Sequence, residues 1–396
     1  MVNRRELLKA MGLTAFAGHV PGLAFANAPT DARLVLVVLR GAVDGLALAA
    51  PYADPDYRDV RGELALTEPG SVNCLLDLDG FFGLHPSLEG VHERFVRGEA
   101  MIVHAVASPY RARSHFDGQD LLENGGDTVG GLRDGWLNRA LAPVAGDHEV
   151  AIALAQNTPL VLRGDNSVTS WAPSRLPDAD ASTIARLQRL YAGDAFFATR
   201  LEQALNSQEI AQGMSGSSRR RGNDARRFEE MMASAARFLV APDGPRIAVV
   251  ELGGWDTHAN QGAASGALAN RFAALDTGLA NLRTGLGVAW KDTAVAVVTE
   301  FGRTVHVNGT RGTDHGTATA ALLVGGAVAG GKVIGDWPGL GRNDLHAGRD
   351  LQPTTDLRSL FKGVLEQHLS IDAGFVEKTV FPESRGARPL ENLIRG

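Results

Sequence analysis

Six short runs of apolar residues recur along the chain, separated by longer stretches with the spacing of helices. The runs cover residues 34–39, 101–106, 150–154, 247–252, 293–299 and 320–324. Most are continuously hydrophobic, which is typical of strands buried on both faces of a sheet. Apolar side chains recur at helical spacing in residues 86–97, 182–205, 224–239, 267–286 and 355–369. This alternation predicts an α/β fold with a mostly parallel central sheet between helical layers.

The chain between residues 207 and 221 is polar and rich in Gly and Ser, and it separates two helical stretches without a strong strand. We interpret it as a loop within a helical insertion at about residues 175–240, not as a boundary between domains. The sequence therefore predicts one large domain over residues 30–396.

The amino terminus looks like a twin-arginine export signal. Arg4 and Arg5 precede a moderately apolar stretch that ends in Ala24, Phe25 and Ala26, a small-x-small cleavage pattern. We expect residues 1–26 to be removed after export by the twin-arginine machinery, which places the protein in the periplasm or outside the cell. Gly and Pro interrupt the apolar stretch, which is shorter than the roughly 20 apolar residues of a stable membrane span.

Charge and cysteine content narrow the function further. The chain has 39 basic and 45 acidic residues, a net charge of −6. This balance argues against a general nucleic-acid partner, because phosphate contacts need a clustered basic surface. Cys74 is the single cysteine, which excludes an intramolecular disulfide.

Polar side chains follow three of the apolar runs at the point where each predicted strand ends. Asp44 follows the first run, Asp256 and His258 follow the fourth, and Glu300 and Arg303 follow the fifth. Ligands bind at the carboxyl ends of the strands in open α/β sheets. Carboxylates and imidazoles gathered there predict a metal site, although Asp44, taken alone, also fits an Asp-Gly turn.

Spacing suggests more specific roles. Asp256 and His258 lie two residues apart, so they can share a metal or one can orient the other. Metal ligation is the better interpretation for His315, and Asp314 is either a ligand or its hydrogen-bonded partner. Arg303 carries a planar donor that suits an oxyanion, and a salt bridge to a carboxylate is the alternative.

Ser114 has two competing interpretations. It precedes a helical pattern and has Asp117 three residues later, as in a capping box. A hydroxyl at a helix start, flanked by Arg111, Arg113 and His115, also suits a nucleophile for an anionic ester. Both roles fit the same geometry.

In order along the chain, Asp44, the PYRARSH segment, GGWDTH, EFGRT and GTDHG resemble the alkaline phosphatase-like hydrolases. The whole mature chain is similar to a family of exported bacterial proteins assigned to that superfamily. The resemblance implies that Asp44, Asp256, His258, Glu300 and His315 hold metal and that Ser114 is the nucleophile. Phe301 stands where the superfamily has a metal-binding histidine.

The expected function is an exported, metal-dependent hydrolase of phosphate or sulfate esters. One or two divalent metals, Zn or Mn given the mixed ligands, would assist Ser114 on a small anionic ester substrate, and Arg303 or Arg113 would hold its oxygens. Phe301 and the narrow spacing of Asp256 and His258 motivate an alternative: a periplasmic binding or assembly protein that keeps the scaffold without turnover.

Overall fold

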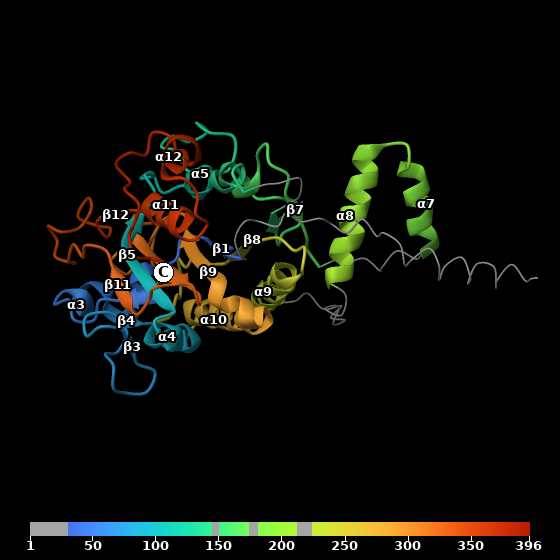
Figure 1. The fold of residues 1–396 in the computed structure, drawn as a ribbon. Helices are drawn as coiled ribbons and strands as arrows, with labels where there is room; N and C mark the ends of the chain where they lie inside the picture. The colour runs from blue at the N-terminus through green and yellow to red at the C-terminus, as the bar shows by residue number, and fades with distance from the viewer. Residues whose placement is uncertain (1–30, 145–149, 174–180, 212–223) are drawn as a thin grey trace, which may run out of the picture.

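A computed structural model describes residues 31–144, 150–173, 181–211 and 224–396 of the chain (Figure 1). Its central feature is a nine-stranded sheet with the order β11-β5-β10-β9-β1-β8-β6-β7, in which β12 also pairs with β5. The strands of this sheet are β1 Arg33–Arg40, β5 Ala100–Ala107, β6 Ala151–Ala153, β7 Thr169–Ser170, β8 Ile247–Gly253, β9 Thr293–Thr299, β10 Thr319–Val324, β11 Lys332–Ile334 and β12 Thr355–Asp356.

The expected mostly parallel sheet is confirmed. β1 pairs in parallel with β8 and β9, while β5 pairs in parallel with β11 and β12. β10 runs antiparallel to both of its neighbours, β9 and β5. Each of the six apolar runs forms a strand of this sheet. A small antiparallel sheet is formed by β2 Ala49–Ala50, β4 Gly83–Leu84 and β3 Leu76–Asp77.

Helices cover both faces of the large sheet. The longer ones are α4 Glu89–Val96, α5 His115–Asn124, α7 Ala181–Tyr191, α8 Ala195–Ala211, α9 Asp224–Val240, α10 Ala267–Leu286 and α11 Leu357–Gln367. The short ones are α2 Gly45–Leu48, α3 Tyr57–Arg61, α6 Trp136–Leu141, α12 Ala373–Phe375, the 3-10 turns η1 Gly62–Leu64, η2 Leu160–Leu162 and η3 Gly287–Asp292, and the π-turn η4 Val376–Val380.

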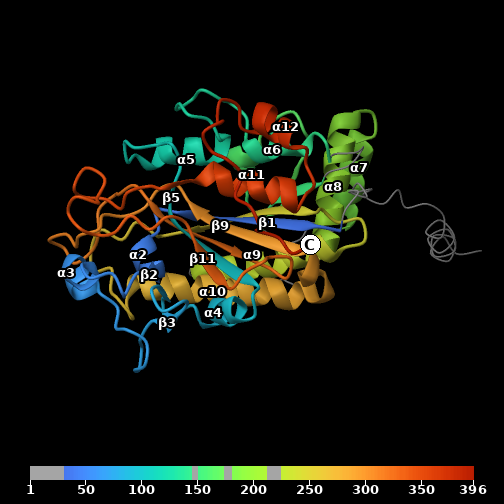
Figure 2. The same cartoon turned by 60° about the vertical axis from the view of Figure 1, so that its left-hand side comes forward.

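Alternation along β1 explains why the sheet has two cores. Val35, Val37 and Leu39 face one layer, which α4, α9 and α10 cover. Leu34, Leu36 and Val38 face the other layer, which α6, α11 and η4 cover. Figure 2 shows these two helical layers on opposite sides of the sheet. Successive side chains of a strand point to opposite faces, so a central strand must be apolar throughout.

The helical stretch predicted over residues 182–205 divides into α7 and α8. The break lies beside Gly193 and Asp194, and the Asp194 carboxylate accepts hydrogen bonds from the amides of Phe196 and Phe197. This capping starts a new helix, and the α7–α8 pair stands at one end of the molecule (Figure 1). By contrast, α9 packs into the main core through residues such as Phe228 and Phe238.

The export signal predicted in residues 1–26 lies outside the described residues, as does part of the predicted insertion. Within the described ranges, no helix has both the length and the apolar content needed to cross a bilayer.

Candidate metal centre

Four segments bring polar side chains to the carboxyl ends of the parallel strands. His115 begins α5, which follows β5, and Asp256 follows β8. Glu300 follows β9 directly, and His315 lies in the loop before β10. The loop after β8 passes close to the end of β1, where a Cβ on Gly41 would lie 2.7 Å from the Asp256 amide nitrogen. This close approach requires glycine at position 41, which also has a φ of 118°.

Three imidazoles surround the Asp256 carboxylate. The Nε2 atoms of His258 and His315 lie 3.0 and 3.1 Å from its Oδ1 atom, and His115 Nε2 lies 3.5 Å from its Oδ2 atom. Candidate ligand atoms of His115, Asp256 and His315 all lie within 4.8 Å of one another. The cluster is open to solvent on one side, because the side chains of Asp256 and His258 are 40% and 44% exposed.

Each of these imidazoles is held through its other nitrogen. His115 Nδ1 lies 2.9 Å from Glu300 Oε1, His258 Nδ1 lies 3.0 Å from Asp314 Oδ1, and His315 Nδ1 lies 2.8 Å from the carbonyl oxygen of Arg113. These three oxygens can only accept, so each ring in its neutral form donates from Nδ1 and carries its lone pair on Nε2. Metal-binding histidines are oriented in this way.

Two features of the Nε2 atoms indicate that a cation fits among them. His115 Nε2 is buried and has no hydrogen-bond partner among the described residues. His258 Nε2 and His315 Nε2 face each other at 3.0 Å, although both carry lone pairs when Nδ1 holds the proton. A divalent ion bound by His115, His315 and Asp256, whose ligand atoms lie within 4.8 Å of one another, would satisfy these two nitrogens, with His258 Nε2 beside it at the carboxylate. A set of imidazoles with one carboxylate suits Zn.

Arg303 holds the central carboxylate. Its Nη1 atom lies 2.6 Å from Asp256 Oδ1, its Nε donates to Thr313 Oγ1, and its side chain is fully buried. Burial opposes ionisation of Asp256, but the hydrogen bond and the charge of Arg303 outweigh it and lower the pKa of the carboxyl. Of the two roles considered for Arg303, the structure contains the salt bridge.

Glu300 is buried and ties the site to the neighbouring strand. Its Oε1 atom accepts hydrogen bonds from the Gly41 amide at 2.9 Å and from Gln119 at 3.2 Å, in addition to its contact with His115. Burial opposes its ionisation, yet these hydrogen bonds keep the pKa of Glu300 below its usual range. The hydrogen bond that His115 donates to Glu300 is also the main reason that the pKa of His115 is raised. Glu300 therefore orients an imidazole within this arrangement.

Arg113 combines an unusual backbone with a paired side chain. Its φ is 64°, and this left-handed conformation accompanies the carbonyl contact with His315. Its guanidinium donates through Nε and Nη2 to Asp350 Oδ2, at 2.9 and 2.7 Å. Asp350 is fully buried. Both arginines considered for substrate oxygens are thus engaged by carboxylates.

Ser114 lies at the N-cap of α5, beside His115. Its hydroxyl makes no capping hydrogen bond, and Asp117 instead accepts from the Tyr110 hydroxyl at 3.1 Å. The predicted capping box is therefore absent at this helix start. The residue is partly exposed, and its hydroxyl is not committed to the helix terminus. Its role as a nucleophile stays a prediction.

The described contacts of Asp44 involve none of the site imidazoles. Its buried carboxylate pairs with buried Arg61, accepts a hydrogen bond from Gln261 at 2.7 Å, and caps α2 through the Ala47 amide. Gln261 in turn accepts from Thr313, the partner of Arg303. Asp44 is therefore connected to Arg303 through hydrogen bonds of Gln261 and Thr313. Its charge is neutralised by the Arg61 guanidinium, and its described contacts include none of the site histidines.

Phe301 forms an apolar wall of the site. Its ring stacks on His115, with centroids 5.0 Å apart and planes at 24°, and packs with Ala42, Tyr110 and Leu121. It also lies 5.3 Å from the His315 ring.

Sequence reasoning treated His115 only as a neighbour of Ser114 and did not consider Gln119. The available signal was its place at the start of a helical pattern that follows a buried strand, an end of the sheet where ligands bind. No sequence pattern predicts the hydrogen bond between Gln119 and Glu300, because it depends on how α5 packs against the end of β9.

A family model described as "Protein of unknown function (DUF1501)" matches residues 31–380. The chain belongs to the DUF1501 family. Comparison with curated protein sequences gave no match for this DUF1501 protein.

Solved structures give distant matches to the DUF1501 chain. The phosphonate monoester hydrolase of Agrobacterium radiobacter is 13% identical, with a TM-score of 0.37 over 91% of this chain and 78% of that chain. The PsFucS1 sulfatase from Pseudoalteromonas sp. is 13% identical, with a TM-score of 0.37 over 98% of this chain and 76% of that one.

Murine ectonucleotide pyrophosphatase/phosphodiesterase 5, in complex with AMP, is 13% identical, with a TM-score of 0.31 over 69% of this chain. The DUF1501 chain spans 57% of the length of that murine structure.

Proposed function

We propose that the chain is an exported, metal-dependent hydrolase of phosphate or sulfate esters. The observation that carries the metal centre is the arrangement of His115, His258 and His315, whose Nε2 atoms all face Asp256 while an oxygen holds each Nδ1 atom. Glu300, Asp314 and the Arg113 carbonyl orient these rings. Asp44 is left out of the proposed ligand set because Arg61 already neutralises it.

Hydrolysis itself rests on the uncommitted hydroxyl of Ser114 and on the resemblance to alkaline phosphatase-like enzymes. A divalent ion bound here would polarise the ester and lower the pKa of a nearby hydroxyl. Ser114 Oγ would give up its proton and attack phosphorus or sulfur, and the bond to the leaving oxygen would break as that oxygen takes up a proton and leaves as the alcohol. Water would then hydrolyse the bond between the anion and the serine and restore the hydroxyl. Phe301 would keep water from one side of the site.

The test uses the chain from residue 27 onward, with metal measured by mass spectrometry and turnover measured on chromogenic phosphate and sulfate esters. We expect bound Zn or Mn and ester cleavage. His315→Ala should lose both, whereas Ser114→Ala should keep the metal and lose turnover. His306→Ala, at an exposed position outside the cluster, is the control. A parent protein that refuses both metals in calorimetry would contradict the proposal.

A metal-holding binding or assembly protein without turnover is the second candidate. The pairing of both Arg303 and Arg113 with carboxylates favours it, because it leaves neither guanidinium free for substrate oxygens. Stoichiometric metal in a parent protein that cleaves no ester across both substrate classes would support this candidate over the first.

Export by the twin-arginine pathway is also part of the proposal. The evidence for it is the sequence of residues 1–26. Replacing Arg4 and Arg5 with Lys should retain the protein in the cytoplasm of an expressing bacterium. Fractionation and immunoblotting measure this, and normal export of the double variant would contradict the assignment.

A further inference from the structure

A small cavity lies between α4 and α10, away from the metal centre. Its volume is about 80 Å³, and its lining includes Arg94 on α4, Arg283 on α10 and Trp290 before β9. Trp290 and Val324 adjoin the amino-terminal end of β9, whereas Glu300 follows its carboxyl end. A buried water needs roughly 10–15 Å³ of such volume, so the cavity has room for several waters or for a small anion.

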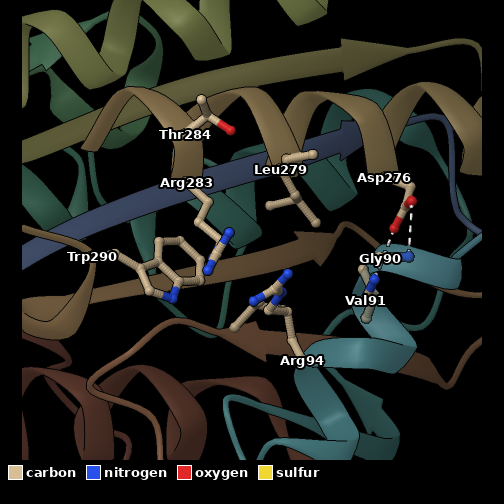
Figure 3. Close-up of a pocket in the computed structure, with 10 residues that line it drawn as sticks. Gly90, Val91, Arg94, Asp276, Leu279, Arg283, Thr284 and Trp290 are labelled. Carbon is tan, nitrogen blue, oxygen red and sulfur yellow. Dashed lines mark hydrogen bonds between the residues drawn. The ribbon is translucent and has the colours of Figure 1, made fainter. Parts of the chain in front are cut away.

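Two cationic groups face this cavity. Figure 3 shows the guanidinium groups of Arg94 and Arg283 directed into the space between the two helices. Leu279, Ala280 and Val324 supply apolar surface around them. Like charges repel more strongly beside apolar surface than in water, so an anion between these two groups would lower the free energy of the pair.

Protein carboxylates supply that anion only in part. Arg94 has two ionic contacts, with Glu93 and Glu99, and both lie at 3.5 Å. Glu99 is shared with the Trp290 indole, which donates to it at 3.2 Å. No ion pair of Arg283 is found among the described residues, and its buried Nε atom has no hydrogen-bond partner there.

The remaining acid of the cavity is already used. Asp276 accepts hydrogen bonds from the amides of Gly90 and Val91 at 3.0 and 2.8 Å, which ties the start of α4 to α10 (Figure 3). Its carboxylate is therefore directed at the backbone of α4. An unsatisfied buried donor in a native protein calls for an explanation such as a bound ion.

We propose that this cavity is an oxyanion site, in which Arg94 and Arg283 together hold a phosphate, sulfate or carboxylate group. Guanidinium groups present planar pairs of donors that match such anions. The site goes beyond the proposed hydrolase function and depends on none of its residues. Because the bound anion would contact both helices, binding should stabilise the packing of α4 against α10.

Inorganic phosphate, sulfate and acetate are the probes, titrated separately into metal-stripped protein by calorimetry. We expect one saturable site. Arg283→Gln and Arg94→Gln should each weaken binding about tenfold or more, because each removes a charged hydrogen-bond donor. Arg97→Gln is the matched control, since Arg97 is at the end of the same helix with its side chain 56% exposed. The comparison of the three probes shows which class of oxyanion fits.

His315→Ala separates this site from the metal centre. Unchanged probe binding in that variant supports the cavity, and loss of binding there would assign the anion to the metal centre and overturn the inference. Absence of binding for all three probes, or equal affinity in Arg283→Gln and the parent, would also overturn it. If Arg283→Gln does not fold, Arg283→Lys and Arg94→Gln carry the test.

Discussion

At the scale of single residues, the candidate site is a set of imidazoles whose direction is fixed by second partners. His115 and His258 each contact a carboxylate through Nδ1, while His315 contacts a backbone carbonyl. The carboxylates of Glu300 and Asp314 therefore have a different task from that of Asp256, although all three are acidic residues near strand ends. Only Asp256 faces several Nε2 atoms.

Replacing Glu300 with Gln tests this division of roles. The variant keeps its size but loses the negative charge behind His115, so we expect metal affinity to fall about 10- to 100-fold. Competition with a chromogenic chelator measures it. Glu251→Gln is the control, because Glu251 pairs with Arg40 rather than with a site imidazole. Affinity equal to that of the parent would show that Glu300 does not support the metal.

Asp44 gives a second prediction at this scale. Asp44→Asn would leave the buried Arg61 charge without its partner, so unfolding free energy should fall by about 3 kcal/mol. Metal content of the folded variant should stay unchanged. Denaturant titration and metal analysis on the same preparation measure both quantities. Loss of metal without loss of stability would restore Asp44 to the ligand set.

At the scale of elements, the seat of α5 decides whether His115 reaches the site. Gly118 lies on the face of α5 toward Phe301, where an added Cβ would come within 2.9 Å of the ring. The missing side chain of Gly118 therefore leaves room for Phe301 to stack on His115. The helix, the strand-end aromatic residue and the imidazole form one packed unit.

Gly118→Ala separates helix propensity from this packing. Alanine favours an isolated helix by about 1 kcal/mol over glycine, yet here the contact must displace Phe301 or α5. We expect weaker metal binding, measured by chelator competition, despite the better propensity. Gly309→Ala, at a position with open space around its Cβ, should bind metal like the parent. Unimpaired metal binding in Gly118→Ala would show that α5 tolerates the shift.

At the scale of the whole molecule, two buried histidines outside the site make stability depend on pH. Burial lowers the pKa of His104 to about 4 and that of His85 to about 4. Each of these rings lies within 3.0 Å of a backbone carbonyl, and His104 also stacks on Phe82. An unfolded histidine takes up its proton near pH 6.5. The unfolded chain therefore binds more protons between about pH 6.5 and 4.

Stability should accordingly fall as pH decreases through that window and stay level above it with respect to these two groups. His104→Gln should make the slope of unfolding free energy against pH shallower by up to about 1.4 kcal/mol per pH unit. Denaturant melts at several pH values measure this slope, with the exposed His306→Gln as control. Parallel slopes for His104→Gln and the parent would contradict the assignment.

The sequence alone determined the six strands that apolar runs form and most of the covering helices, whereas the short strands β7, β11 and β12 carry no apolar run of their own. Continuous apolar runs such as residues 34–39 can be stable only where both faces are covered, so they identified the central strands without further information. The same runs placed Asp256, His258 and Glu300 at strand ends, because chain order fixes which residues come directly after a strand.

Only the tertiary structure decided what each polar group does. The pairing of Asp44 with Arg61, of Arg113 with Asp350 and of Glu300 with His115 joins residues that lie 17, 237 and 185 positions apart. A carboxylate can bind a metal, neutralise a guanidinium or orient an imidazole, and the residue type, Asp or Glu, does not distinguish these roles. The choice depends on which partner the packing of strands and helices brings within hydrogen-bond distance.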